Sequence, residues 1–368
     1  MSEYQYYEWQ TVDRLLTEAE QDAVSGPSSH IDVTASQAVV TYDWSDFRHD
    51  PRKVLARYFD AHLYFANWGT RILMFRFPPG LLDEAAVAPY LVENTIRLST
   101  EGKSRILEFC FEDEEPEWAD FEGELSGLIS LRNELLAGDY RCLYLGWLKA
   151  LSLLDEDGQG DLEEPPVPAG LARLTPALQR FAGFFDLDPH LIKSAAETSP
   201  AKAATVSNAA LRKAIGTLSR KECDDYLLRL LQGEAGLGFT FRHRLQSALK
   251  APPQPASDGR TAEELFTGAK RAKRQDAERK AAADEKRRIA ALEKLAQKEE
   301  QAWQAVETQL AERHWTYHSK AVEQLQQLRD LAEYRKTRAD FNRRLKALRE
   351  RHKERASIMK RLAKARLV

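Results

Sequence analysis

The densest group of polar and aromatic side chains in the sequence ends at residue 71. Its members are Arg57, Tyr58, Asp60, His62, Tyr64, Asn67, Trp68 and Arg71. If this stretch is helical, Asp60, Tyr64 and Asn67 share one face, and the end of the helix presents Trp68 beside Arg71. Asp60 and His62 could act as acid and base, but no nucleophile, phosphate-binding loop or second carboxylate accompanies them. The group therefore favours polar side chains that fix a helix to a sheet. A groove for a peptide or small ligand is the alternative, ahead of catalysis.

A second candidate is the run of basic residues near the end of the sequence. Twelve Lys and Arg side chains lie within residues 338–366, where acids are few; the candidates for contact with nucleic acid are Arg343, Arg344, Lys346 and Arg351. Contacts of this kind release counterions from phosphates, so they depend on salt and carry little sequence preference. No aromatic stacking platform interleaves with these cations. A solvated face, or docking onto an acidic surface, is the alternative.

Charge is divided unevenly along the chain. Residues 251–368 hold 29 basic and 18 acidic side chains, a net charge of +11, whereas residues 1–250 carry a net charge of −14. The formal net charge of −3 for the whole chain hides this division. An acidic body joined to a basic arm predicts that the arm meets phosphates or an acidic protein surface, including that of its own body.

Residues 289–310 have the spacing of a coiled-coil seam. The chain has no glycine or proline after Gly268, which predicts near-continuous helix. Apolar side chains then follow 3–4 spacing, and the candidates for contact with a partner are Trp303, Val306 and Leu310. The seam predicts association with a protein partner, with a second copy of the chain, or with the chain's own body.

The sequence predicts no cofactor and no metal ion. His314 and His318 stand one helical turn apart, but a glutamate between them and a third ligand are missing. The three cysteines are too widely spaced for a disulfide framework or a local zinc site, which suits a reducing cytoplasm. No apolar run approaches the ~18 residues of a membrane span, and the N-terminus lacks the basic region of a secretory signal. We expect a cytoplasmic protein without membrane contact.

Glycine, proline and capping residues divide the sequence into an α+β part followed by helices. Aromatic and β-branched runs predict strands near 4–9, 38–42 and 71–77 and a hairpin over 95–111, and a helix is expected from Pro51 to Asn67. The expected organisation is a mixed α+β domain at 1–115, a helical-hairpin domain at 116–250 with an acidic linker at 155–170, a Pro/Gly-containing linker at 251–269, a charged, coiled-coil-like helix at 270–312 and a basic helical hairpin at 313–368.

Two segments resemble known proteins. The tail, with AVEQLQQLRDLAE and ADFNRRLKALRERHKERASIMKRLAKARL, resembles the C-terminal helical segment of bacterial SWIM zinc-finger proteins. The segments SEYQYYEWQTVDR and RYFDAHLYFANWGTR are similar to those of an uncharacterised family of bacterial proteins. The SWIM motif needs a Cys-x-Cys pair and a later Cys-x-His, and neither occurs in this sequence. The resemblance therefore implies a helical tail, and neither the zinc site nor the SWIM-type contact with nucleic acid carries over to this chain.

The sequence favours a non-enzymatic scaffold that assembles partners through its helical and coiled-coil regions. The alternative is an accessory factor that binds nucleic acid through residues 338–366. An enzyme centred on Asp60 and His62 is a third hypothesis, and no recognisable catalytic motif supports it.

Overall fold

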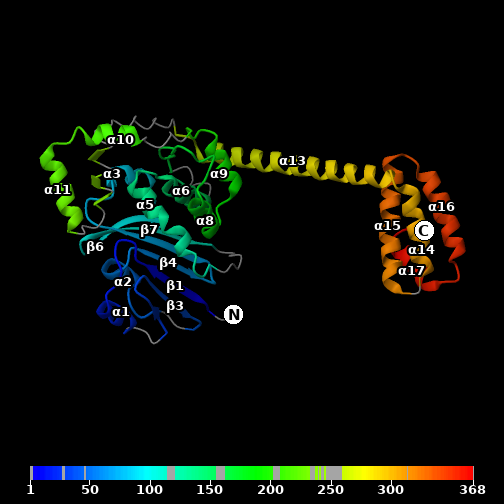
Figure 1. Cartoon of the computed structure of the whole chain (residues 1–368), viewed down its shortest axis with the longest axis horizontal. Coiled ribbons are helices and arrows are strands. Elements are labelled where there is room, and N and C mark those ends of the chain that lie inside the picture. The colour runs from blue at the N-terminus through cyan, green and yellow to red at the C-terminus, as the bar shows by residue number, and fades with distance from the viewer. Residues whose placement is uncertain are drawn as a thin grey trace. The chain divides into compact units, whose positions relative to one another are not determined.

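The computed structural model describes residues 3–26, 30–44, 47–113, 121–154, 162–201, 208–232, 237–238, 240–241, 244–245, 259–312 and 314–367. The chain divides into two compact units, Met1–Lys273 and Arg274–Val368. The division falls inside one long helix, α13 (Ala262–Ala296; Figure 1). Residues 155–161 of the expected acidic linker and residues 251–258 of the expected Pro/Gly linker lie outside the described residues.

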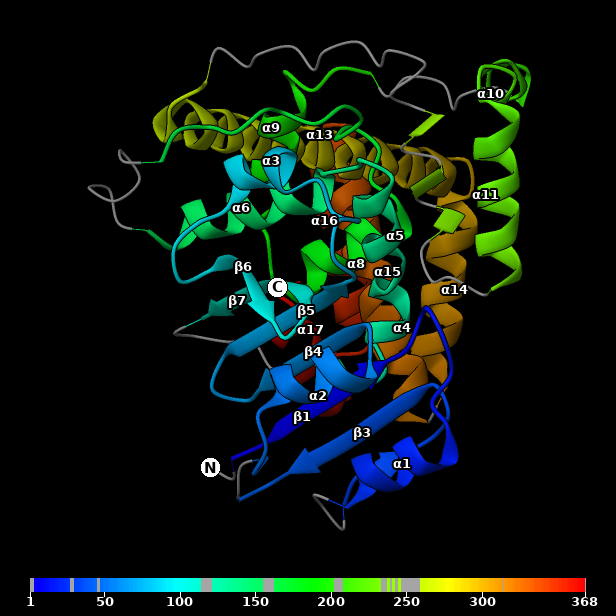
Figure 2. The same ribbon diagram turned by 90° about the vertical axis from the view of Figure 1, so that its left-hand side faces the viewer.

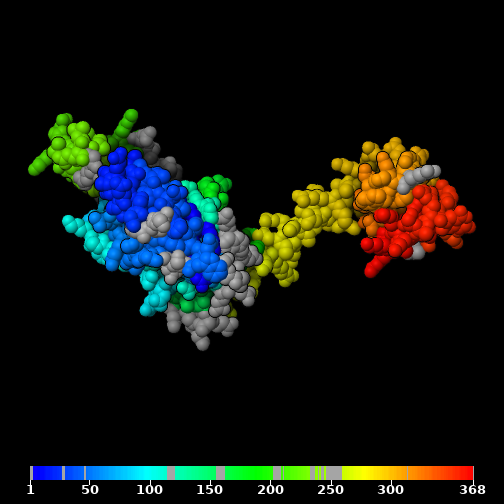
Figure 3. Space-filling model, turned by 90° about the horizontal axis from the view of Figure 1, so that it is seen from below, coloured from blue at the N-terminus to red at the C-terminus, as the bar shows by residue number. Residues whose placement is uncertain are grey.

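The described part of the first unit contains one antiparallel sheet of seven strands, in the order β2-β3-β1-β4-β5-β7-β6. Because β1 pairs with both β3 and β4, the aromatic N-terminal segment lies inside the sheet and not at its edge. The face of this unit seen in Figure 3 is formed largely by the first hundred residues. The strands are β1 (Gln5–Gln10), β2 (Asp32–Val33), β3 (Gln37–Tyr42), β4 (Ala61–Ala66), β5 (Thr70–Phe77), β6 (Ile96–Glu101) and β7 (Ser104–Glu112).

Helices cover both faces of the sheet (Figures 1 and 2). On one face α1 (Glu18–Ser25) and α2 (Pro51–Tyr58) bury Trp9 and Leu55. The helices over the other face are α3 (Glu84–Val87), the 3-10 helix η1 (Ala88–Tyr90), α4 (Leu125–Leu128), α5 (Ser130–Leu136), α6 (Arg141–Leu153), α8 (Pro176–Phe184) and α9 (Pro189–Ala196). Further along the chain come α10 (Asn208–Ile215) and α11 (Arg220–Leu231).

These helices and the sheet share one hydrophobic core. Phe109 of β7 contacts Phe181 of α8 edge-to-face, with ring centroids 5.1 Å apart. The same cluster of buried side chains continues to Leu265 of α13. The boundary expected at residue 115 therefore does not separate two cores, because the helices after it bury their apolar faces on the sheet before it.

The start of α13 is anchored in this core, in the region where the sequence predicted a linker. Arg260 forms an ion pair with buried Glu164, and Ser194 of α9 donates a hydrogen bond to the carbonyl of Leu265 over 2.9 Å. A side chain at Gly268 would meet the Ser194 hydroxyl at 2.1 Å, so glycine permits the close approach of α9 and α13. Residues 262–269 therefore belong to the helix and not to a linker.

In the described residues of the second unit, the regular elements are all helices, joined by short turns. Its helices after α13 are α14 (Glu299–Ala311), α15 (Trp315–Tyr334), α16 (Arg338–Arg351) and α17 (Ala356–Lys364). They enclose a second hydrophobic core, which includes Leu325, Leu328, Leu345 and Ile358. The expected fold class, an α+β part followed by a helical region, is confirmed at this level.

In the described residues, no helix combines the length and the apolar composition that crossing a bilayer requires.

Candidate nucleic-acid interface

The segment around Asp60 and His62 is a strand and not the expected helix. Helix α2 ends at Tyr58, Phe59 adopts an extended backbone, and β4 begins at Ala61. Leu63 belongs to the core on one face of the sheet and Tyr64 to the core on the other. A strand buried on both faces shows no alternation of polar and apolar residues, so its apolar residues matched a helical spacing by coincidence.

Asp60 and His62 are buried in structural roles. Asp60 is paired with Arg76 and accepts hydrogen bonds from the backbone N–H groups of Val12 and Asp13 at 2.6 and 2.9 Å. His62 stacks on Trp9, with ring centroids 4.6 Å apart, and its Nδ1 lies 2.9 Å from the carbonyl oxygen of Glu8. Complete burial lowers the pKa of His62 to about 3. A neutral, enclosed imidazole and an ion-paired carboxylate do not present acid–base chemistry to a substrate.

The remaining members of this group do not converge on one groove. Asn67 accepts a hydrogen bond from the backbone N–H of Tyr4, and Tyr64 donates to Gln5. Arg71 is buried and donates to the carbonyl of Phe184 over 2.8 Å, whereas Trp68 is exposed and donates to Thr70. The structure thus assigns these side chains to separate structural contacts.

The seam residues of 289–310 are buried inside the second unit. Trp303 is 6% exposed, and Val306 and Leu310 are fully enclosed. The Trp303 ring packs 5.6 Å from Phe341 of α16, and the guanidinium of Arg344 lies 5.5 Å from its centroid. The expected near-continuous helix is interrupted, because α13 ends at Ala296 and α14 begins at Glu299. Trp303, Val306 and Leu310 share one core with side chains of α15, α16 and α17 of the same unit, so they cannot reach a partner in this fold.

The basic candidates on α16 lie at the surface, and three of the four are ion-paired. Arg343 pairs with Asp340, Arg344 with Glu300 and Arg351 with Glu307. Lys346 is exposed, and within the described residues it has no ion pair. The acids from α14 and α16 reduce the positive potential of this face.

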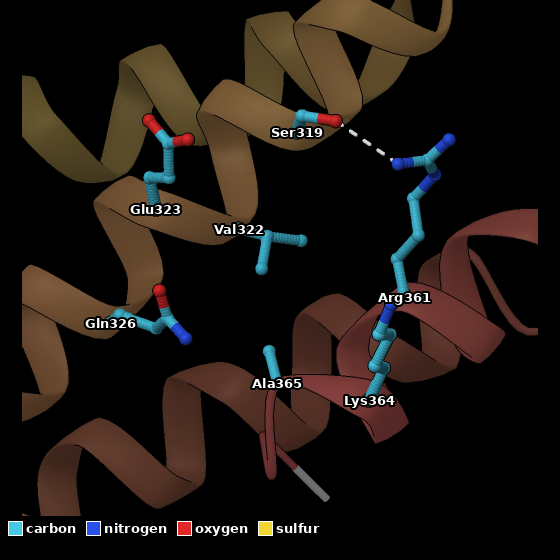
Figure 4. Close-up of a pocket in the computed structure, with 7 residues that line it drawn as sticks. All are labelled: Ser319, Val322, Glu323, Gln326, Arg361, Lys364 and Ala365. Atoms are coloured by element: carbon cyan, nitrogen blue, oxygen red, sulfur yellow. Dashed lines mark hydrogen bonds between the residues drawn. The ribbon is translucent and has the colours of Figure 1, made fainter. Parts of the chain in front are cut away.

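A groove between α15 and α17 brings together a different basic set (Figure 4). It has a volume of about 330 Å³, and its lining residues are Ser319, Val322, Glu323, Gln326, Arg361, Lys364 and Ala365. Arg361 reaches across it and donates to the Ser319 hydroxyl over 3.0 Å (Figure 4). Val322 and Ala365 give the groove an apolar part, while its rim carries two cations and one carboxylate, Glu323.

Trp315 lies beside this groove, at the start of α15. Its side chain is 59% exposed, and the Arg361 guanidinium lies 5.9 Å from its ring centroid. The neighbouring His314 ring stacks at 6.1 Å. On another face of α15, Tyr317 is also exposed and Lys320 lies over its ring at 6.0 Å. An exposed aromatic side chain therefore lies next to the cations of α17 in the fold, although no exposed aromatic side chain is interleaved with the cations in the sequence of 338–366.

His314 and His318 make structural contacts at the start of α15. The Nδ1 atom of His314 caps the helix by accepting from the Thr316 N–H, and the buried His318 places its Nε2 atom 2.8 Å from the Glu312 carbonyl oxygen. Among the residues that the structure describes, no three His, Cys, Asp or Glu side chains are grouped so that they could hold a metal ion.

Sequence reasoning missed Trp315, Ser319, Arg361 and Lys364 as one site. Trp315 and Arg361 are far apart in the chain, and only the packing of α17 against α15 brings them together. The available signal was a tryptophan outside the heptad positions of the apolar seam.

Comparison of the chain with protein-family models, with curated proteins and with solved structures gave no match in any of the three.

Proposed function

We propose that the second unit binds nucleic acid through the groove between α15 and α17. The observation that carries this proposal is Arg361, which is held between the Trp315 ring and the Ser319 hydroxyl at the rim of the groove. A guanidinium offers five N–H donors in a fixed plane, and one contact to Ser319 leaves others for a phosphate. Lys364, on the same helix, adds a second cation.

The composition of the arm supports the same partner. Residues 251–368 carry a net charge of +11, which favours a polyanion. A further cation with an exposed side chain, Lys360, lies about one turn before Lys364 on α17. Phosphate contacts do not read base identity, so we expect little sequence preference. In this proposal the chain acts as a nucleic-acid-associated accessory factor, and the helical-hairpin arrangement of 313–368 is the scaffold of the groove.

A paired charge reversal tests the position of the interface. Arg361→Glu/Lys364→Glu changes the groove, and Arg343→Glu/Lys346→Glu makes the same change of net charge on α16. Lost charge-assisted phosphate contacts are worth about 1.5–3 kcal/mol each, so loss of both contacts in the α17 pair should weaken binding by roughly a hundredfold or more. The α16 pair should weaken it only about threefold, through the general potential.

The measurement is fluorescence anisotropy of a labelled oligonucleotide of about 20 nucleotides, titrated with the full chain at about 50 mM salt. Equal losses for the two pairs would show that net charge and not the groove controls binding. Absence of binding by the unaltered chain would refute the proposed function.

Self-association is a second candidate function, and one surface favours it. Helix α11 exposes four leucines, with Leu231 86% exposed; they are Leu227, Leu228, Leu230 and Leu231. Large apolar side chains grouped on one helix mark interaction sites more often than isolated ones do. We propose that this helix, and not the buried seam at 289–310, supports assembly with a second copy of the chain.

The oligomeric state tests this second proposal. Light scattering after size-exclusion chromatography should give a dimer for the unaltered chain and a monomer for Leu227→Gln/Leu231→Gln, because the substitutions remove exposed apolar area without opening a core. Leu153→Gln, at another exposed leucine, is the control and should remain dimeric. A monomer for the unaltered chain, at concentrations up to about 100 μM, would exclude a dimer of biologically relevant affinity.

A further inference from the structure

We propose that the groove takes single-stranded nucleic acid, with one unpaired base stacked on the indole ring of Trp315. This inference depends on the proposed function and specifies its substrate class. The two tryptophans of the second unit differ sharply in environment. Trp303 is 6% exposed and fills the core, whereas Trp315 is 59% exposed and contributes nothing to the core cluster. An exposed indole on a helix that the fold holds in place is available as a stacking surface.

Two side chains neighbour the Trp315 ring. Arg361 lies against its ring and is tied to Ser319, and the His314 ring stacks beside it. His314 is itself fixed as the cap of α15. These neighbours restrict the rotation of the ring before a ligand arrives, which lowers the entropy cost of stacking.

Arg361 couples the stacking surface to the groove. A cation beside an aromatic ring lets one nucleotide place its base on the ring and its phosphate on the guanidinium. Ser319 and Gln326 follow along α15 as neutral hydrogen-bonding groups, and Val322 provides apolar contact for a base or sugar. A volume of about 330 Å³ is at the small end of ligand sites, which is the size of one nucleotide.

In a duplex both faces of each base are covered by neighbouring bases, so Trp315 could contribute only after unstacking. In a single strand the base faces are open, and stacking on an aromatic side chain tolerates any base. The groove also contains Glu323, which lies on α15 opposite the cations of α17 and disfavours a phosphate there. The geometry thus directs the backbone toward Arg361 and Lys364, and the bases toward Trp315.

The test compares a single strand of about 12 thymidines with a duplex of equal length, by anisotropy with the full chain. We expect the single strand to bind at least about tenfold more tightly than the duplex. Trp315→Ala should weaken single-strand binding by roughly five- to a hundredfold and leave duplex binding unchanged, whereas Trp315→Phe should retain most of the affinity. Tyr317→Ala removes an exposed aromatic beside a lysine on another face of α15, and it should have no effect.

The outcomes separate the inference from the function on which it depends. The single-strand inference would be overturned if the single strand and the duplex bind equally and Trp315→Ala keeps the affinity of the unaltered chain. Phosphate binding would still stand if Arg361→Glu/Lys364→Glu weakens the affinity for both. Binding of neither form would overturn both. A polyglutamate peptide that competes as well as the single strand would also overturn the inference, because the groove would then recognise an acidic chain without bases.

Discussion

Replacing Trp303 by alanine is expected to lower the free energy of unfolding of the second unit by about 3–5 kcal/mol. The indole is buried among Phe341, Val306 and the other side chains of one hydrophobic cluster. Its removal takes away the transfer free energy of a large ring and leaves a cavity that the surrounding helices fill only in part. The same change should not alter the oligomeric state, since Trp303 lies inside one chain.

Trp315→Ala is the matched control, because it removes the same side chain from the surface of the same unit. We expect it to change stability by less than about 0.5 kcal/mol. Hydrogen exchange of the full chain, followed by mass spectrometry on peptides from α15 and α16, measures both effects, and peptides from β4 and β5 give an internal reference. Unchanged protection of α15 in Trp303→Ala would contradict the packed core described above.

Arg260→Ala is expected to destabilise the first unit by about 3–5 kcal/mol, because it leaves a buried carboxylate without its cation. Arg260 contacts Glu164 through Nε at 3.0 Å and through Nη2 at 2.5 Å, and it also donates to the carbonyls of Ser194 and Ala195. Tyr144 donates to the same carboxylate over 2.5 Å. The variant thus releases the start of α13 from α6 and α9.

The destabilisation of the first unit by Arg260→Ala should depend on pH in a defined direction. Burial raises the pKa of Glu164, but the hydrogen bonds from Arg260 and Tyr144 outweigh it and hold this pKa below its ordinary value. A lowered pKa in the folded state means stability that is present above the ordinary pKa and lost as pH falls through the folded value. In Arg260→Ala the carboxylate of Glu164 stays buried without its cation. The stability lost in this variant should therefore be largest at neutral pH and should shrink as Glu164 becomes protonated.

Arg271→Ala is the control for this anchor. Arg271 is also on α13 and also pairs with a glutamate, but both partners of the Arg271–Glu197 pair are exposed, and such pairs contribute about 0–1 kcal/mol. Hydrogen exchange of α6 and α9 peptides, corrected for the intrinsic pH dependence of exchange, compares the two variants. Equal protection in both would show that Arg260 is not an anchor.

Local patterns identified most of the strands and helices of this chain. The hairpin of β6 and β7, the strand β5 and the N-cap of α2 follow from turn residues, β-propensity and the Asp50-Pro51 start. The expected helix across residues 61–66 is the strand β4, because a strand buried on both faces has no period of two in its apolar residues. The turn after it needs Gly69, which has φ of +105° and would place a Cβ atom 2.1 Å from the Asp113 carbonyl oxygen.

The candidate site was less accessible to sequence reasoning than the fold. Charge composition indicated that the arm is basic, but it could not show which cations are neutralised by neighbours. Arg344 and Arg351 of α16 meet Glu300 and Glu307 of α14, and those pairs exist only after the helices pack. The same is true of Trp315 and Arg361, whose contact depends on how α17 returns to α15.

The most direct test of phosphate binding at the groove between α15 and α17 is the salt dependence of affinity for a single strand. Each phosphate contact on a single strand contributes about 0.7 to the slope of log affinity against log salt. Arg361 and Lys364 together with Lys360 predict a slope of roughly −2, and Arg361→Gln/Lys364→Gln should make it shallower by about 1.4. A slope near zero, or a steep slope that this double variant leaves unchanged, would contradict phosphate binding at this groove.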